Sequence, residues 1–191
     1  TWFEARACKN SGARTMARGN VSNTGLMMAR LCYDLLMEKG RDALAAVERH
    51  EVTPALEDVV EATIYLSGLG FENGGLAAAH AVNDGFAQEP QAHGMYHGEK
   101  VAFGTLVQLV LEKAPQEELE QVLAFLRDTG LPLTLAQLGV KEIVPETLKK
   151  VAEAAVVPTQ STKNLRADIT AQEVYDAILE ADRIGRDYLA R

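Results

Sequence analysis

The sequence predicts an all-α protein, organised as a multi-helix, bundle-like domain. Apolar residues recur at helical spacing along most of the chain, and capping or helix-breaking residues separate the apolar stripes. No segment alternates long enough for a strand: Val156 and Val157 form too short a run, and Pro132 interrupts the run from 131 to 134. The stripes and breakers together predict roughly eight helices.

The chain begins abruptly. Residues 2–8 already read as the middle of an amphipathic helix, with neither an initiator Met nor a capping segment ahead of them. Two explanations stay open, namely removal of Met before Thr1 or a chain cut from something longer. The missing helix-start signals favour the second.

The next two helices have clearer limits. The first is expected to begin after a cap at Thr24 and to stop at Gly40, and the second to begin at Thr53-Pro54. Their apolar stripes are Met28, Leu31, Cys32, Leu35 and Leu36, and then Leu56, Val59, Val60 and Thr63.

In the second half of the chain, a helix with apolar residues at 119, 122, 123 and 126 follows Pro115 and ends near Gly130. The last helix opens at Thr170, with Glu173 three residues further on, which is the spacing of a capping box. Residues 158–168 have little apolar content, so we expect a flexible surface loop there.

Length and composition suit one domain spanning residues 1–191. The formal net charge is −8 and no basic patch is visible, which argues against a nucleic-acid partner. No apolar run approaches the roughly 20 residues that span a bilayer, so no membrane partner is expected. Cys8 and Cys32 can be neither paired nor excluded from pairing, but so few thiols without an export signal favour a reducing, cytoplasmic location.

His80 is the first candidate for chemistry, because it is the one metal-binding side chain in a run of small residues at 74–79. A core histidine whose ring bonds to a carbonyl is the alternative interpretation. His97 opens a second apolar helix after a glycine-rich connection. His93 and His97 are four residues apart, but Gly94 and Pro90 favour a loop, so a shared helix face is not assured. His50 lies in a charged run and is expected to be solvated.

These residues carry a resemblance. Residues 74–80, the turn expected at 83–85, and residues 97–104 are similar to the metal-binding signature of the iron-containing alcohol dehydrogenase family. Further similarity to its glycerol-oxidising members lies in residues 2–8, 53–57 and 65–72, so the resemblance covers most of the chain.

The resemblance implies a divalent metal held by one aspartate and two histidines, which correspond to His80 and His97. The aspartate would lie four residues before Thr1, outside the chain, as would an N-terminal nucleotide-binding domain. Phe71 would pack against the polyol. Iron-type members carry a further histidine at the position of Thr1, so zinc is favoured over iron.

The implied reaction is the oxidation of glycerol, or of a related vicinal diol, to dihydroxyacetone with NAD. Zinc would lower the pKa of the alcohol, and hydride would pass to the nicotinamide. His93 is one possible route for the proton. The family also implies a homo-oligomer. Dehydroquinate synthase and glycerol-phosphate dehydrogenases take charged substrates, whereas Lys100 is the only cation near the histidines in sequence, so a neutral polyol is preferred.

Two further classes of function stay open. One is a non-catalytic oligomerisation or interaction module, because the chain alone is expected to bind zinc weakly and to be inactive with NAD. The other is a zinc hydrolase, for which Glu99 and Glu72 are candidate bases by proximity in sequence only. Each of these carboxylates is more readily interpreted as solvated or as a helix cap.

Overall fold

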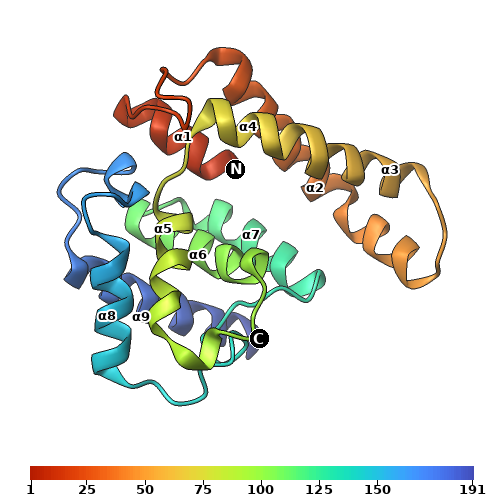
Figure 1. The fold of residues 1–191 in the computed structure, drawn as a ribbon. Coiled ribbons are helices and arrows are strands. Elements are labelled where there is room, and N and C mark those ends of the chain that lie inside the picture. The colour runs from red at the N-terminus through yellow and green to blue at the C-terminus, as the bar shows by residue number, and fades with distance from the viewer. The chain divides into compact units, whose positions relative to one another are not determined.

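The computed structural model describes residues 1–191, and its regular structure is entirely helical, which confirms the all-α prediction. It contains nine α-helices, one more than the rough expectation, together with one π-helical and three 3₁₀ turns. The chain divides into two compact units, an N-terminal unit, Thr1–Leu76, and a C-terminal unit, Ala77–Arg191 (Figure 1). No helix combines the length and the apolar character needed to cross a membrane.

The N-terminal unit is a long helical hairpin with a short helix against it. Its elements are α1 (Trp2–Ser11), α2 (Asn23–Glu48), α3 (Pro54–Glu61), the π-helical turn η1 (Ala62–Leu66) and α4 (Ser67–Gly74). The last three follow one another without a break, so they form a single rod that runs beside α2 (Figure 1). Thr53 caps this rod as expected, since its side chain accepts a 3.3 Å hydrogen bond from the N–H of Leu56.

The predicted limits of α2 are wrong at both ends. Ser22, and not Thr24, is the N-cap, and its hydroxyl accepts a 2.9 Å bond from the N–H of Gly25. The helix also continues through Gly40 to Glu48. A mid-helix glycine costs only about 0.5–1 kcal/mol relative to alanine. Burial of Ala43 and Ala46 in the turns that follow Gly40 favours continuing the helix.

Glycines bring the rod close to its neighbours. A Cβ at Gly25 would lie 2.5 Å from the Cβ of Asn73, and one at Gly74 would lie 2.6 Å from the Cβ of Ala5. Only a residue without a side chain fits such contacts. This close approach accounts for part of the glycine-rich sequence of α4.

The C-terminal unit is a cluster of helices around one apolar core. Phe86 and Phe103 meet edge to face in that core, with ring centres 6.1 Å apart. Its elements are α5 (Ala78–Gly85), η2 (Phe86–Gln88), η3 (Pro90–Ala92), α6 (His97–Glu112), α7 (Gln116–Asp128), α8 (Pro145–Ala155), η4 (Ser161–Asn164) and α9 (Ala171–Leu189). α6 and α9 begin at the residues that the sequence predicted, and Thr170 and Glu173 form the expected capping box.

Part of the connection between α7 and α8, residues 132–135, is buried although it is not helical. Leu133 and Leu135 are almost fully buried, and the carboxylate of Asp182 accepts a 2.8 Å hydrogen bond from the N–H of Leu135. Gly185 allows this approach, because a Cβ there would lie 1.9 Å from the carbonyl oxygen of Leu133. This segment therefore contributes to the core of the C-terminal unit.

Two other expectations about loops are corrected. Residues 158–168 are not simply a flexible surface loop, because η4 lies within them and Thr162 is only 2% exposed. The hydroxyl of Thr162 donates to the carbonyl of Ala155, and that of Ser161 to the carbonyl of Ala77, both at 2.6 Å. The turn expected at residues 83–85 is the last turn of α5, in which Asn83 is buried. Tertiary contacts override the local turn signals in both segments.

Candidate metal and substrate site

His80 and His97 come together in the C-terminal unit. His80 is the third residue of α5 and is half-buried, whereas His97 is the first residue of α6 and is exposed. Their ring centres are 5.3 Å apart and the ring planes are inclined by 45°. The two side chains that the sequence singled out are therefore neighbours in space, although 16 residues separate them in the chain.

The arrangement of the two rings fits a shared divalent ion. An imidazole nitrogen binds zinc at about 2.0–2.1 Å, and tetrahedral angles would then separate the centres of two bound rings by about 5 Å. The observed separation of 5.3 Å agrees with this value. No group of three His, Cys, Asp or Glu side chains that could hold a metal occurs in residues 1–191. The chain thus offers two nitrogen ligands at this position and no third ligand of these types.

Close packing between α5 and α6 holds the pair. A Cβ at Gly104 would lie 2.4 Å from the carbonyl oxygen of Ala79, so the two helices touch one residue before His80. Gln108, which is fully buried, accepts a 3.0 Å hydrogen bond at Oε1 from the N–H of Ala79. Sequence reasoning missed Gln108. Its signal was a polar residue inside the apolar run 106–109, since buried polar side chains usually have a specific partner.

Asn83 is another residue that sequence reasoning did not single out. It lies one turn after His80, so the two residues are on the same side of α5. Its Nδ2 donates to Asp84 at 3.0 Å, and Gln160 donates to the other carboxylate oxygen of Asp84 at 3.1 Å. The buried Oδ1 of Asn83 has no hydrogen-bond partner. The amide is therefore oriented through its NH₂ group alone.

The other two histidines, His93 and His50, do not join the pair in a group that could hold a metal. His93 is exposed in the turn before α6 and not on a helix with His97, as the glycine and proline around it predicted. Its Nε2 is 3.0 Å from the carbonyl oxygen of Ala87, a contact in which Nε2 carries the proton. His50 is exposed at the end of α2, with a positive φ of 56°. It lies in the N-terminal unit, whereas His80 and His97 lie in the C-terminal unit.

Neither candidate base for a hydrolase stands out. Glu99 accepts a 2.6 Å hydrogen bond from the backbone N–H of Tyr96, so it caps α6 as the alternative interpretation expected. Glu72 is exposed on α4. Phe71, the candidate for substrate contact, is half-buried on the same helix in the N-terminal unit, and its role stays a prediction.

The sequence matches no protein-family profile, but individual relatives are clear. Over 189 residues it is 56% identical to a glycerol dehydrogenase of Escherichia coli O6:H1, a match covering 99% of this chain and 52% of that protein. A glycerol dehydrogenase of Pseudomonas putida is 50% identical with the same two coverages. The chain therefore spans about half the length of the curated relatives it matches.

Solved structures agree with these relatives. A probable glycerol dehydrogenase from Sinorhizobium meliloti 1021 superimposes with a TM-score of 0.94 at 42% identity, over 97% of this chain and 52% of that one. A 1,3-propanediol oxidoreductase, at 17% identity and a TM-score of 0.68, shares the fold. The chain belongs to the glycerol dehydrogenase family, within the iron-containing alcohol dehydrogenase fold, and represents its C-terminal part.

Proposed function

We propose that residues 1–191 are the metal- and substrate-binding half of an NAD-dependent enzyme that oxidises glycerol to dihydroxyacetone. The observation that carries this proposal is the His80–His97 pair, with ring centres 5.3 Å apart, in a chain 56% identical to a glycerol dehydrogenase. Related vicinal diols are the alternative substrates. A neutral substrate is preferred to a phosphorylated one, because residues 50–99 contain no lysine or arginine that could bind an anionic group.

In this proposal His80 and His97 hold a zinc ion, and an aspartate from the part of the relatives that this chain does not span is the third ligand. Two imidazoles, one carboxylate and an open position are a common donor set for catalytic zinc. A zinc ion held there would supply Lewis acidity, which makes a bound alcohol easier to deprotonate.

The side chains of this chain would bind and orient the substrate. The buried alanines at 77–79 fix the backbone that presents His80, and exposure of His97 lets a ligand reach the pair from solvent. Phe71 is proposed to give the carbon skeleton an apolar wall. His93 is proposed to pass a proton to water, because Nδ1 stays available while Nε2 bonds to Ala87. NAD would be held mainly outside this chain.

The substrate assignment is tested with the protein that carries this sequence at its natural length. NAD reduction is measured with glycerol, 2,3-butanediol and glycerol phosphate as substrates. We expect the highest kcat/KM for glycerol, because no cation other than Lys100 lies near the histidines in sequence. A preference for the phosphate ester would refute the assignment.

The metal assignment is tested by calorimetric titration of residues 1–191 with Zn²⁺. We expect weak binding that His80→Ala and His97→Ala abolish, and no NAD-dependent activity. His50→Asn is the matched control, since asparagine tolerates the positive φ at that exposed position. Stoichiometric submicromolar binding would show that another residue of the chain replaces the aspartate.

A further inference from the structure

An apolar groove runs along the outer side of the α3–η1–α4 rod. Its apolar lining is Val52, Leu56, Val60, Ile64, Tyr65 and Leu69. The hollow between Val52 and Tyr65 has a volume of 580 Å³, and a second hollow of 260 Å³ adjoins it, sharing Ile64 and Tyr65. We refer to the two hollows together as the α3–α4 groove. It lies entirely within the N-terminal unit.

The side chains that line the groove are unusually exposed for their type. Val52 is 81% exposed, Ile64 68% and Tyr65 64%. Contiguous apolar surface of this kind is uncommon on a protein that acts alone, and it marks contact with a partner more often than isolated exposed residues do. The groove is therefore a candidate binding site for a ligand or a partner that has an apolar surface of its own.

The spacing of the lining residues favours a helical partner. Leu56, Val60 and Ile64 are four residues apart and form one ridge along the rod. The π-helical turn η1 adds one residue per turn, so the ridge continues at Leu69 after a spacing of five. From Leu56 to Leu69 the ridge extends about 20 Å at 1.5 Å per residue. That length suits a helix of several turns better than a compact small molecule.

The charge around the groove specifies the partner further. Glu57 and Glu61 line it, one turn apart, and neither forms an ion pair. Residues 50–76 contain no lysine or arginine, so no cation of this segment offsets the two carboxylates. Asp58, by contrast, is paired with Lys39 on the α2 side of the rod. Two like charges one turn apart repel each other, and a cation from outside would relieve that repulsion.

We propose that the α3–α4 groove binds a basic amphipathic helix of another protein, with its apolar ridge on Val60 and Ile64 and its lysines or arginines beside Glu57 and Glu61. Tyr65 adds an exposed aromatic face for one of those cations. A second copy of this chain suits the groove less well. A symmetric pairing of two such segments would offer Glu57 and Glu61 no cation, because residues 50–76 contain no lysine or arginine.

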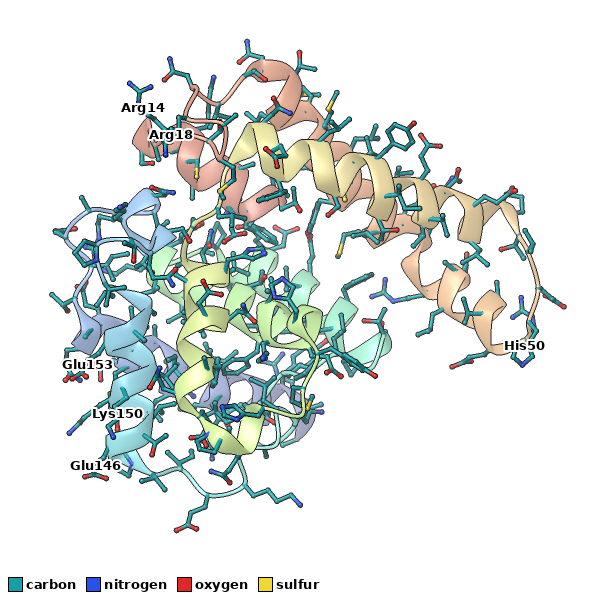
Figure 2. The ribbon with its side chains drawn as sticks, viewed as in Figure 1. Arg14, Arg18, His50, Glu146, Lys150 and Glu153 are labelled. Carbon is teal, nitrogen blue, oxygen red and sulfur yellow. The ribbon has the colours of Figure 1, made fainter.

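The test uses a fluorescent 18-residue peptide of leucine and lysine, with leucines spaced to form one helix face. Its binding to the protein is measured by fluorescence anisotropy at low and high salt. We expect at least tenfold weaker binding to the double variant Glu57→Lys/Glu61→Lys. The matched control is Glu146→Lys/Glu153→Lys, which reverses two exposed carboxylates of α8 (Figure 2) and should leave the affinity within twofold.

A second pair of variants tests the apolar ridge. Val60→Ser/Ile64→Ser should weaken binding at least tenfold, and Ile143→Ser/Val144→Ser, at exposed positions of similar character, should not. Circular dichroism checks that all four variants keep their helix content. Equal binding of a peptide with the same composition but scattered leucines would refute the proposal, as would binding to either groove variant that is as tight as binding to the unchanged protein. Sedimentation velocity tests whether a second copy of the protein occupies the groove instead. A dimer that the variant Ile64→Ser dissociates would show that it does.

Discussion

The side-chain amide of Gln108 accepts a 3.0 Å hydrogen bond from the backbone N–H of Ala79. This N–H lies in the first turn of α5, where backbone donors have no partner within the helix. Gln108 also donates to Glu112 at 2.7 Å, which fixes the orientation of the amide. Because α6 carries His97 and α5 carries His80, one side chain thus joins the two helices that present the histidine pair.

Replacing Gln108 with leucine should destabilise the protein and weaken metal binding. Leucine fills a similar volume but leaves the buried N–H of Ala79 without a partner, which costs about 1–3 kcal/mol. We expect a lower urea midpoint and weaker Zn²⁺ binding by calorimetry, because α5 would no longer be fixed one residue before His80. Both quantities are measured on the same preparation.

The matched control is Gln172→Leu. Gln172 also donates to an acidic residue one turn later, Asp176 at 2.8 Å, but on the exposed surface of α9. Its replacement should change the free energy of unfolding by less than about 0.5 kcal/mol. Equal losses in the two variants would mean that the bond to Ala79 contributes nothing specific.

Gly104→Ala tests the contact between the same two helices. The added methyl group would lie 2.4 Å from the carbonyl oxygen of Ala79, so α6 must move away from α5. Overpacking of this kind typically costs about 1–3 kcal/mol. We expect a lower melting temperature by differential scanning calorimetry and a loss of Zn²⁺ affinity, because His80 and His97 would separate.

Gly98→Ala provides the control in the same helix. A Cβ at Gly98 has no heavy atom within 4 Å, and alanine is the better helix former. The variant should be neutral or more stable by up to about 1 kcal/mol. A Gly104→Ala protein as stable as the parent would show that the helices can separate without cost.

Cys8 should be chemically inert in the folded protein. Burial, with a contribution from the nearby charge of Glu4, raises the pKa of the Cys8 thiol to about 12. Since the thiolate is the reactive form, we expect no labelling of Cys8 by iodoacetamide at pH 8 until urea unfolds the chain, as read by mass spectrometry. The raised pKa also means that stability should fall as the pH rises above 9.0, the ordinary value for the unfolded thiol. Fast labelling in native buffer would contradict this account.

Local signals predicted some elements well and missed others for identifiable reasons. Thr53 and Thr170 cap helices as their sequences predict, because the bonds they make reach only three residues ahead. Gly40 does not end α2, since later turns of the helix are buried by tertiary packing. The histidines were recognisable from their setting, whereas the bond from Ala79 to Gln108 spans 29 residues and has no local pattern. Burial of Thr162 depends likewise on contacts that sequence periodicity does not encode.

The carboxylate of Glu173, which caps α9, should make the free energy of unfolding depend on pH in the acid range. The backbone N–H of Thr170 and then the side chain of Arg166 hold the pKa of Glu173 below its usual value of 4.5. A carboxyl group with a lowered pKa in the folded state contributes stability above pH 4.5, and the contribution is lost as the pH falls through the lower folded value.

The variant Glu173→Gln tests this dependence. Its amide can still accept a hydrogen bond from Thr170, but the charge and its pH dependence are removed. We therefore expect the urea midpoints of the two proteins to differ most near pH 7 and to converge below pH 4. Glu153→Gln, at an exposed position of α8, corrects for the loss of one negative charge, and a gap that stays constant with pH after this correction would rule out the ionised cap.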